Sequence, residues 1–129
     1  MNADSGSCRR RLDDDQIGLV VEVFRMLADG TRVRLLWALR DREMSVSQLA
    51  DEVGKAAPSV SQHLAKLRMA RLVRTRREGT TIYYSVENEH IRQLVVDAVH
   101  NAEHASPGVP PHHTSDAGLR ALHQNGGAS

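Results

Sequence analysis

The stretch AAPSVSQHLAKLRMARLVRTRREGTTIYY, residues 56–84, determines the fold that this sequence predicts. In its first half, Val60, Leu64 and Leu67 recur at helical spacing, and Pro58 suits the first position of a helix, where no N–H is needed. The candidate DNA contacts of this helix are Ser59, Ser61, Gln62, His63 and Lys66. Hydroxyl, amide and cationic groups can donate to phosphates or pair with base edges in a major groove. We therefore interpret the segment as a recognition helix; the alternative is a solvated helix face.

The second half of the stretch has the pattern of a basic β-hairpin. Apolar residues alternate as in strands on both sides of a turn at Gly79, and they are Leu72, Val73, Ile82, Tyr84 and Val86. Four arginines crowd the same segment, namely Arg71, Arg74, Arg76 and Arg77. Because a basic hairpin beside a polar helix face can straddle a phosphate backbone, we take Arg74, Arg76 and Arg77 as candidate DNA contacts.

A short helix is predicted immediately before the recognition helix. The segment Ser45-Val46-Ser47-Gln48 matches a capping box, which opens a helix, and Gly54 is placed to end it. A helix, a short turn, a second helix and a hairpin together form a winged helix-turn-helix. The predicted fold class is therefore mainly α with a β-hairpin.

Positive charge is concentrated in this predicted module, although the whole chain has a formal net charge of +1. Residues 30–84 hold eleven of the 17 Lys and Arg residues but five of the 16 Asp and Glu residues. A basic module thus lies between acidic flanks. This asymmetry indicates double-stranded DNA as a partner more clearly than the net charge does.

Length and composition predict one small domain. The chain has 129 residues, of which 3% are aromatic, so its core must be built from Leu, Val, Ile and Ala. Its apolar runs fall short of the roughly 20 residues of a membrane span, and its polar start is unlike a secretory signal. We expect a cytoplasmic protein without membrane association. Cys8, the single cysteine, cannot form an intrachain disulfide.

The sequence divides into three predicted parts. Residues 1–12 form a disordered N-terminal arm, residues 13–104 a DNA-binding and dimerisation domain, and residues 105–129 a flexible tail. Within the domain, we predict that Thr31 caps the second helix and Asn88 the last one. The first and last helices are both apolar along one side. We expect a homodimer that buries these two helices; the alternative is a monomer in which they fold back on its own core.

The seven histidines are unevenly distributed. His63 lies in the recognition helix, and the other six lie in or beyond the last helix, namely His90, His100, His104, His112, His113 and His123. Together with Glu103 they offer a ligand set that suits a borderline transition metal. For any one of them, the alternative is a solvated histidine.

Helical geometry indicates how such a site would form. His90 and His104 are fourteen residues apart, which is roughly 21 Å along a helix and about 40° around its axis. One helix cannot bring both side chains to one ion. If two last helices pack antiparallel across a dimer axis near Asp97, His90 of one chain meets His104 of the other. Two equivalent sites would then bridge the interface, and His112 and His113 could close over them.

Three segments together resemble a known family. They are LADGTRVRLL at residues 27–36, SVSQHL at residues 59–64, and the hairpin from residue 78 to residue 84. Over about residues 17–104 the chain resembles the ArsR/SmtB family of metal-sensing repressors, and within it the mycobacterial nickel and cobalt sensors. The resemblance implies a homodimer that binds operator DNA in its metal-free form and releases it when nickel or cobalt binds.

The same resemblance implies a metal-ligand set. A histidine that opens the last helix, a Glu-His pair at its end and a His-His pair in the tail correspond to His90, Glu103, His104, His112 and His113. Whether His100 binds the metal in addition to Glu103 or in its place stays open. Imidazole and carboxylate ligands suit Ni²⁺ and Co²⁺, and zinc remains the alternative ion.

Several residues depart from the family pattern. Residues 44–49 carry no thiol, which argues against the soft metals that sulfur ligands favour. Asn88 and Asn101 stand where the zinc sensors of the family have ligands, and Arg71 replaces a glycine that is usual after the recognition helix. We predict a regulator and no enzyme, because the sequence offers no nucleophile site and no HExxH motif. The alternative function is a zinc-sensing or metal-independent regulator of the same family.

Overall fold

Residues 10–105, the part of the chain that this computed structural model describes, form five helices and three short strands. They follow the order α2 (Asp14–Leu27), α3 (Gly30–Ala38), β1 (Met44–Ser45), α4 (Val46–Val53), α5 (Ala57–Met69), β2 (Val73–Glu78), β3 (Thr81–Val86) and α6 (Glu89–Ala105). Residues 1–9 and 106–129 lie outside the described residues, and with them Cys8, His112, His113 and His123. The three predicted domain boundaries therefore stay predictions.

Helices α2 and α4 both begin at capping boxes, of which the sequence predicted the one at α4. The Asp13 carboxylate accepts the backbone N–H of Gln16 at 2.7 Å, and the Gln16 side chain accepts the backbone N–H of Asp13 at 3.0 Å. Ser45 and Gln48 make the same reciprocal pair at the start of α4, as predicted. Gly54 ends α4 in the left-handed conformation, with φ +70°. These local signals determine where the helix before the recognition helix starts and stops.

Helices α3 and α5 begin differently from the prediction. Thr31 was the wrong cap for α3, because Asp29 is the N-cap and its carboxylate accepts the backbone N–H of Arg32 at 3.0 Å. Thr31 lies in the first turn and is 4% exposed. Pro58 stands at the second position of α5, since the helix already begins at Ala57. A proline fits there equally well, because the first N–H groups of a helix have no partner within it.

The last helix begins at the predicted cap. The side-chain oxygen of Asn88 accepts the backbone N–H of Ile91 at 3.0 Å, and α6 then runs without interruption to Ala105. The continuity of α6 matters for the site, because it sets the separation of His90 and His104.

A single hydrophobic core joins α3, α4, α5, the base of α6 and one face of the sheet. Its buried side chains are Leu35, Leu36, Leu39, Met44, Leu49, Val60, Leu64, Leu67, Leu72, Val73 and Val95. The predicted stripe of α5 is thus confirmed. The antiparallel sheet has the order β1-β3-β2, in which Met44 pairs with Tyr84. The sequence pattern gave the β2–β3 hairpin but not β1, because two residues form a strand only through pairing with distant β3.

The recognition helix ends in a left-handed turn at Arg71, with φ +62°. The N–H of Arg71 donates to the carbonyl of Arg68 and the N–H of Leu72 donates to that of Leu67, both at 2.9 Å. This is a Schellman end, in which glycine is the usual left-handed residue. Leu72 is 1% exposed and anchors the turn in the core. The turn fixes the direction in which the chain leaves α5 to form the wing.

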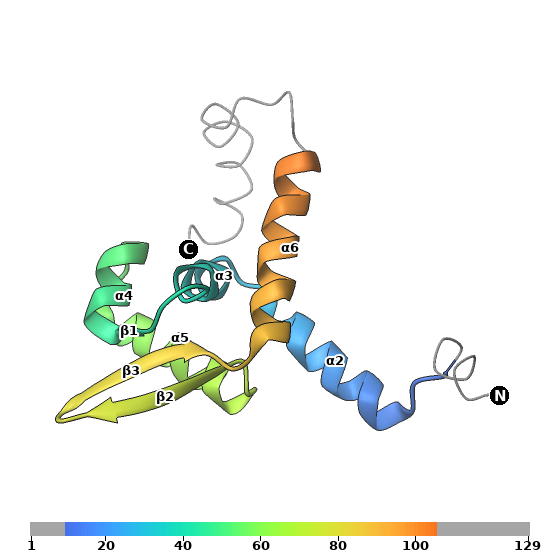
Figure 1. The fold of residues 1–129 in the computed structure, drawn as a ribbon, viewed down its shortest axis with the longest axis horizontal. Helices are drawn as coiled ribbons and strands as arrows, with labels where there is room; N and C mark the ends of the chain where they lie inside the picture. The colour runs from blue at the N-terminus through green and yellow to red at the C-terminus, as the bar shows by residue number, and fades with distance from the viewer. Residues whose placement is uncertain (1–9, 106–129) are drawn as a thin grey trace.

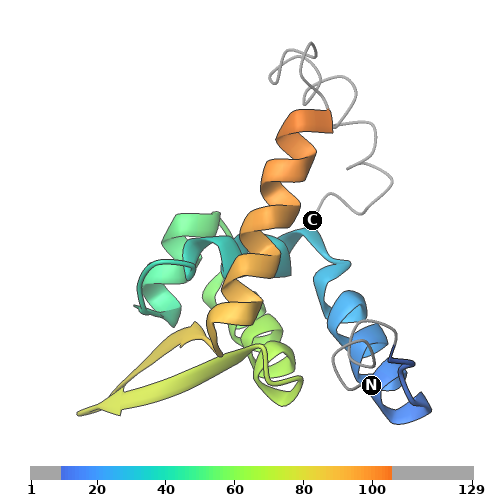
Figure 2. The same ribbon diagram turned by 45° about the vertical axis from the view of Figure 1, so that its right-hand side comes forward.

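Helix α2 and the outer part of α6 project from the core in different directions (Figure 1, and the turned view in Figure 2). Within the described residues, α2 has no buried side chain, and Leu19 and Phe24 are 70% and 57% exposed. Apolar surface of this extent on a helix marks a site of protein contact. None of the helices in residues 10–105 combines the length and apolar character needed to cross a membrane.

Candidate DNA interface and metal-binding helix

The outer face of α5 carries most of the predicted DNA contacts. Ser59, Gln62 and Lys66 lie together on this face and are exposed, because the opposite face of the helix is locked into the core by its three buried aliphatic residues. Ser61 is also exposed, but it lies about 160° around the helix from Ser59. Figure 1 shows α5 beside the β2–β3 hairpin, at the end of the molecule away from the outer part of α6. Exposed donors on one helix face can reach base edges and phosphates together.

His63 lies at the flank of this face and is half-buried. Its Nδ1 is 3.5 Å from a guanidinium nitrogen of Arg32 in α3, and Arg32 Nε donates to the carbonyl of Met26 at 2.8 Å. A guanidinium can only donate, so this contact is a hydrogen bond only when Nδ1 carries no proton. The sequence pattern identified His63 but missed Arg32, which holds it against α3.

Asp29 completes this group at the start of α3. Burial opposes ionisation of its carboxyl, but the backbone N–H and the guanidinium of Arg32 outweigh burial, and with His63 they lower the pKa of Asp29. The carboxylate thus caps α3 through the backbone N–H of Arg32 and attracts the guanidinium of the same residue. The group connects the recognition helix to the start of α3.

The wing arginines divide between the two faces of the sheet. Successive residues of a strand point to opposite faces, and directly paired residues share a face. Arg77 pairs with Ile82, and so lies on the face that Val73 buries against α5. Arg74 and Arg76 lie on the other face, where they pair with Ser85 and Tyr83. Arg77 is therefore the wing arginine on the same side as the recognition helix.

Arg76 is occupied by contacts within the protein. Its Nε donates to Glu43 at 2.9 Å, another of its nitrogens donates to Glu78 at 2.9 Å, and its guanidinium lies 4.9 Å from the ring centroid of Tyr83. The hydrogen bonds from Arg76 lower the pKa of Glu43. In turn, the carboxylates of Glu43 and Glu78 raise the pKa of Arg76. Arg76 thus holds the wing against the segment that precedes β1. Sequence spacing does not reveal this pair, because Glu43 is 33 residues away.

The histidines of α6 lie on the face that points away from the core. Val95 is 3% exposed and marks the buried side. At about 100° per residue, His90 lies roughly 140° and His104 about 180° from Val95 around the helix. Both are exposed, as are His100 and Glu103. The predicted ligands within α6 are therefore accessible to a partner and unavailable to the core of their own chain.

A single chain does not assemble the predicted metal site from the described residues. Within residues 10–105, no three side chains of His, Cys, Asp or Glu lie close enough together to hold a metal. Asp97, midway between His90 and His104, accepts a hydrogen bond of 2.8 Å from Gln93. The predicted ligands His112 and His113 fall outside the described residues.

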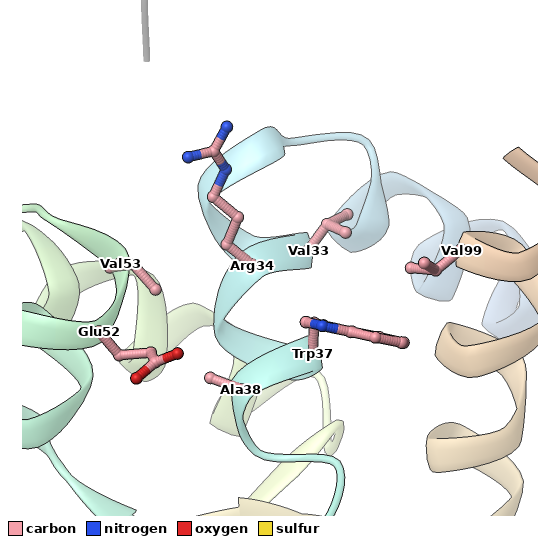
Figure 3. Close-up of a pocket in the computed structure, with 7 residues that line it drawn as sticks. All are labelled: Val33, Arg34, Trp37, Ala38, Glu52, Val53 and Val99. Carbon is pink, nitrogen blue, oxygen red and sulfur yellow. The ribbon is translucent and has the colours of Figure 1, made fainter. Parts of the chain in front are cut away.

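A small cavity of about 300 Å³ lies between α3, α4 and α6. Figure 3 shows Val99 of α6 pointing towards the indole of Trp37, with Arg34 and Glu52 on the opposite side of Trp37 from Val99. Its remaining lining residues are Val33, Ala38 and Val53. With one carboxylate and mostly aliphatic walls, this cavity lacks the ligands of a metal site.

A polar recognition helix, a basic hairpin and two projecting helices define a winged helix-turn-helix DNA-binding protein. Residues 29–75 match the family model described as a bacterial regulatory protein of the arsR family. The chain belongs to this family of transcriptional regulators.

Individual relatives support the same assignment. The chain is 70% identical over 122 residues to the HTH-type transcriptional regulator KmtR of Mycobacterium tuberculosis. This match covers 95% of this chain and 92% of KmtR. It is 33% identical over 104 residues to NmtR of the same organism, covering 81% and 87%. The solved homodimeric winged helix-turn-helix domain of Mb0332 from Mycobacterium bovis superimposes with a TM-score of 0.67 and 28% identity, covering 78% of this chain and 97% of that one. The predicted fold class, family and non-enzymatic role are confirmed.

Proposed function

We propose that this regulator is a homodimeric repressor that binds operator DNA without metal and releases it when nickel or cobalt binds to its last helices. The observation that carries the proposal is the row formed by His90, Asp97 and His104 on the face of α6 opposite the core. A second helix that packed on this face would meet these polar side chains.

The dimer is supported by the apolar surface that one chain leaves exposed. Helix α2 contributes Ile17, Val20, Val21 and Phe24 to this surface, each more than two-fifths exposed. The related domain from Mycobacterium bovis is described as homodimeric. A two-fold dimer would present two α5 helices to successive major grooves, about 34–36 Å apart. Burial of α2 would therefore also create the geometry that a two-fold operator requires.

The proposed metal site uses one end of α6 from each chain. His90 of one chain would bind with Glu103 and His104 of the other, and His112 and His113 of the tail would complete the shell. Two such sites would form per dimer. Imidazole and carboxylate ligands suit Ni²⁺ and Co²⁺, and more than four ligands would distinguish these ions from tetrahedral zinc. His100 remains an addition to Glu103 or its replacement.

Metal need only favour a dimer arrangement in which the two α5 helices no longer fit successive grooves. Coupling free energies between two sites are typically about 1 to 3 kcal/mol, which is a change of roughly 5- to 150-fold in affinity. Because α6 joins directly to β3 through residues 87 and 88, a shift of the last helix would be transmitted to the wing.

Subunit complementation tests the shared site. Homodimers of His90→Ala and of His104→Ala should each bind no Co²⁺ at these sites. A mixed dimer with one chain of each kind should recover one site, because its two unaltered histidines then face each other. A site built within one chain would give no recovery, and that result would contradict the proposal. Release of operator DNA by zinc alone would support the zinc-sensing alternative instead.

A further inference from the structure

Residues 40–43, which connect α3 to β1, are attached to the last helix by Arg92. The Nε of Arg92 donates to the carbonyl of Arg40 at 3.0 Å, and a terminal nitrogen donates to Asp41 at 3.3 Å. The other terminal nitrogen donates to Glu89 within α6 at 3.1 Å. One guanidinium thus uses its planar set of donors to join the first turn of α6 to this connection.

The other end of the connection is attached to the wing. Glu43 accepts hydrogen bonds from Arg76 of β2, and the next residue, Met44, pairs with Tyr84 of β3. Within the connection, Arg40 donates to the carbonyl of Trp37 at 2.7 Å and lies 3.7 Å above the Trp37 ring. Residues 40–43 are therefore held at both ends and also against α3.

We propose that Arg92 and Glu43 are positioning residues that make residues 40–43 a link between the last helix and the wing. The inference rests on the proposed function, because it adds a second route, beside the direct connection through residues 87 and 88, by which metal at His90 would reach the wing. His90 stands between Glu89 and Arg92 in the first turn of α6. A movement of that turn either breaks the contacts of Arg92 or carries residues 40–43 and the wing with it.

A role limited to stability does not account for these contacts. The side chains of Arg76 and Glu43 are 50% and 38% exposed, and exposed ion pairs contribute little to folding free energy. What the pairs restrict is geometry, since they attach two separate elements to one short connection. Weak contacts of this kind can also break and re-form when the helix moves.

The test uses the full-length dimer and Co²⁺ as the probe. Operator affinity is measured by fluorescence anisotropy with and without Co²⁺, and Co²⁺ affinity is measured separately by absorption spectroscopy. Glu43→Gln keeps the size of the side chain and lies outside α6, so its Co²⁺ affinity should remain that of the wild type. The ratio of metal-free to metal-loaded operator affinity should fall at least about threefold, a substantial part of the roughly 5- to 150-fold typical of coupled sites.

Arg92→Gln and the double variant show whether the two residues act together. Arg92→Gln should lower the ratio by a similar factor, and the double variant should lower it no further than either single change, because residues in one network are not additive. Arg42→Gln is the matched control. Arg42 belongs to the same connection but pairs with Glu52 of α4 at 3.9 Å, so its ratio should equal that of the wild type.

Hydrogen exchange of the metal-free protein gives a second measurement that needs no metal. Arg92→Gln should speed amide exchange in residues 74–85 of the wing, whereas Arg42→Gln should not. If Glu43→Gln and Arg92→Gln both keep the wild-type ratio, or if the wing exchanges as before, the link is refuted. Tighter operator binding by Glu43→Gln with an unchanged ratio would also refute it, because Glu43 would then only neutralise Arg76. If metal does not change the operator affinity of the wild type, the proposed function is refuted. The exchange rates of the wing amides in the metal-free protein still test the link in that case.

Discussion

Replacing Arg77 by Ala tests the assignment of the wing face. Arg77 is exposed on the sheet face shared with α5, whereas Arg76 is held by Glu43 and Glu78. Each phosphate contact contributes about 0.9 to the slope of log affinity against log salt concentration. A dimer has two wings, so Arg77→Ala should flatten this slope by about 1.8. Over a fourfold range of salt, that change alters the cost of the substitution by about 12-fold.

Fluorescence anisotropy with the operator and a scrambled duplex of equal length, between about 50 and 200 mM salt, measures this slope. Arg77→Ala should weaken both duplexes alike, because phosphates carry no sequence information. Arg76→Ala is the matched control and should change the slope less. Gln62→Ala should instead reduce the preference for the operator and leave the slope unchanged. An unchanged slope for Arg77→Ala, with a flattened one for Arg76→Ala, would refute the assignment of the two faces.

The remaining predictions concern the metal, the tail and the turn after α5. His90→Ala or His104→Ala should keep the dimer and its metal-free operator affinity but abolish the release of operator DNA by nickel or cobalt in anisotropy titrations. His123→Ala should have no effect. A full metal response in both of the first two variants would contradict this prediction. Deleting residues 107–129 should lower Co²⁺ affinity, measured by competition with a chelator, while the dimer persists, and equal affinities would mean that the tail supplies no ligand. In urea unfolding, the free energy of unfolding of Arg71→Gly should stay within about 1 kcal/mol of that of the wild type, because relief of the positive φ offsets the greater freedom of the unfolded chain. Arg71→Val should lower the free energy of unfolding by about 1 kcal/mol or more. Equal stabilities of the variants would argue against strain at this turn.

Local chemistry made much of the fold predictable from the sequence. The capping box at Ser45 and Gln48, the cap at Asn88 and the turn at Gly79 act over three or four residues, so their effects can be read along the chain. The stripe of α5 was equally clear, because burial on one helix face imposes a period of 3.6 residues. These signals sufficed for the winged helix-turn-helix and its family.

Choices between neighbouring residues and contacts across the chain were not predictable in the same way. Asp29 and Thr31 can both cap a helix, and the N-cap of α3 is Asp29, whose carboxylate also attracts the guanidinium of Arg32. Strand β1 exists only because β3 pairs with it. In the sequence, Arg76 and Arg77 are equivalent candidate DNA contacts, and only the fold shows that Glu43 lies beside Arg76. The geometry of the candidate metal site is harder still to predict, because its proposed ligands come from two chains.

Operator affinity measured with and without each metal tests the central claim most directly. At one fixed salt concentration, the metal-free dimer should bind its operator, and Ni²⁺ or Co²⁺ should weaken that binding by roughly 5- to 150-fold. A chelator should restore the original affinity, and Zn²⁺ should have a smaller effect than either ion. Operator affinity that stays the same in protein shown to hold Ni²⁺ or Co²⁺ would contradict the account.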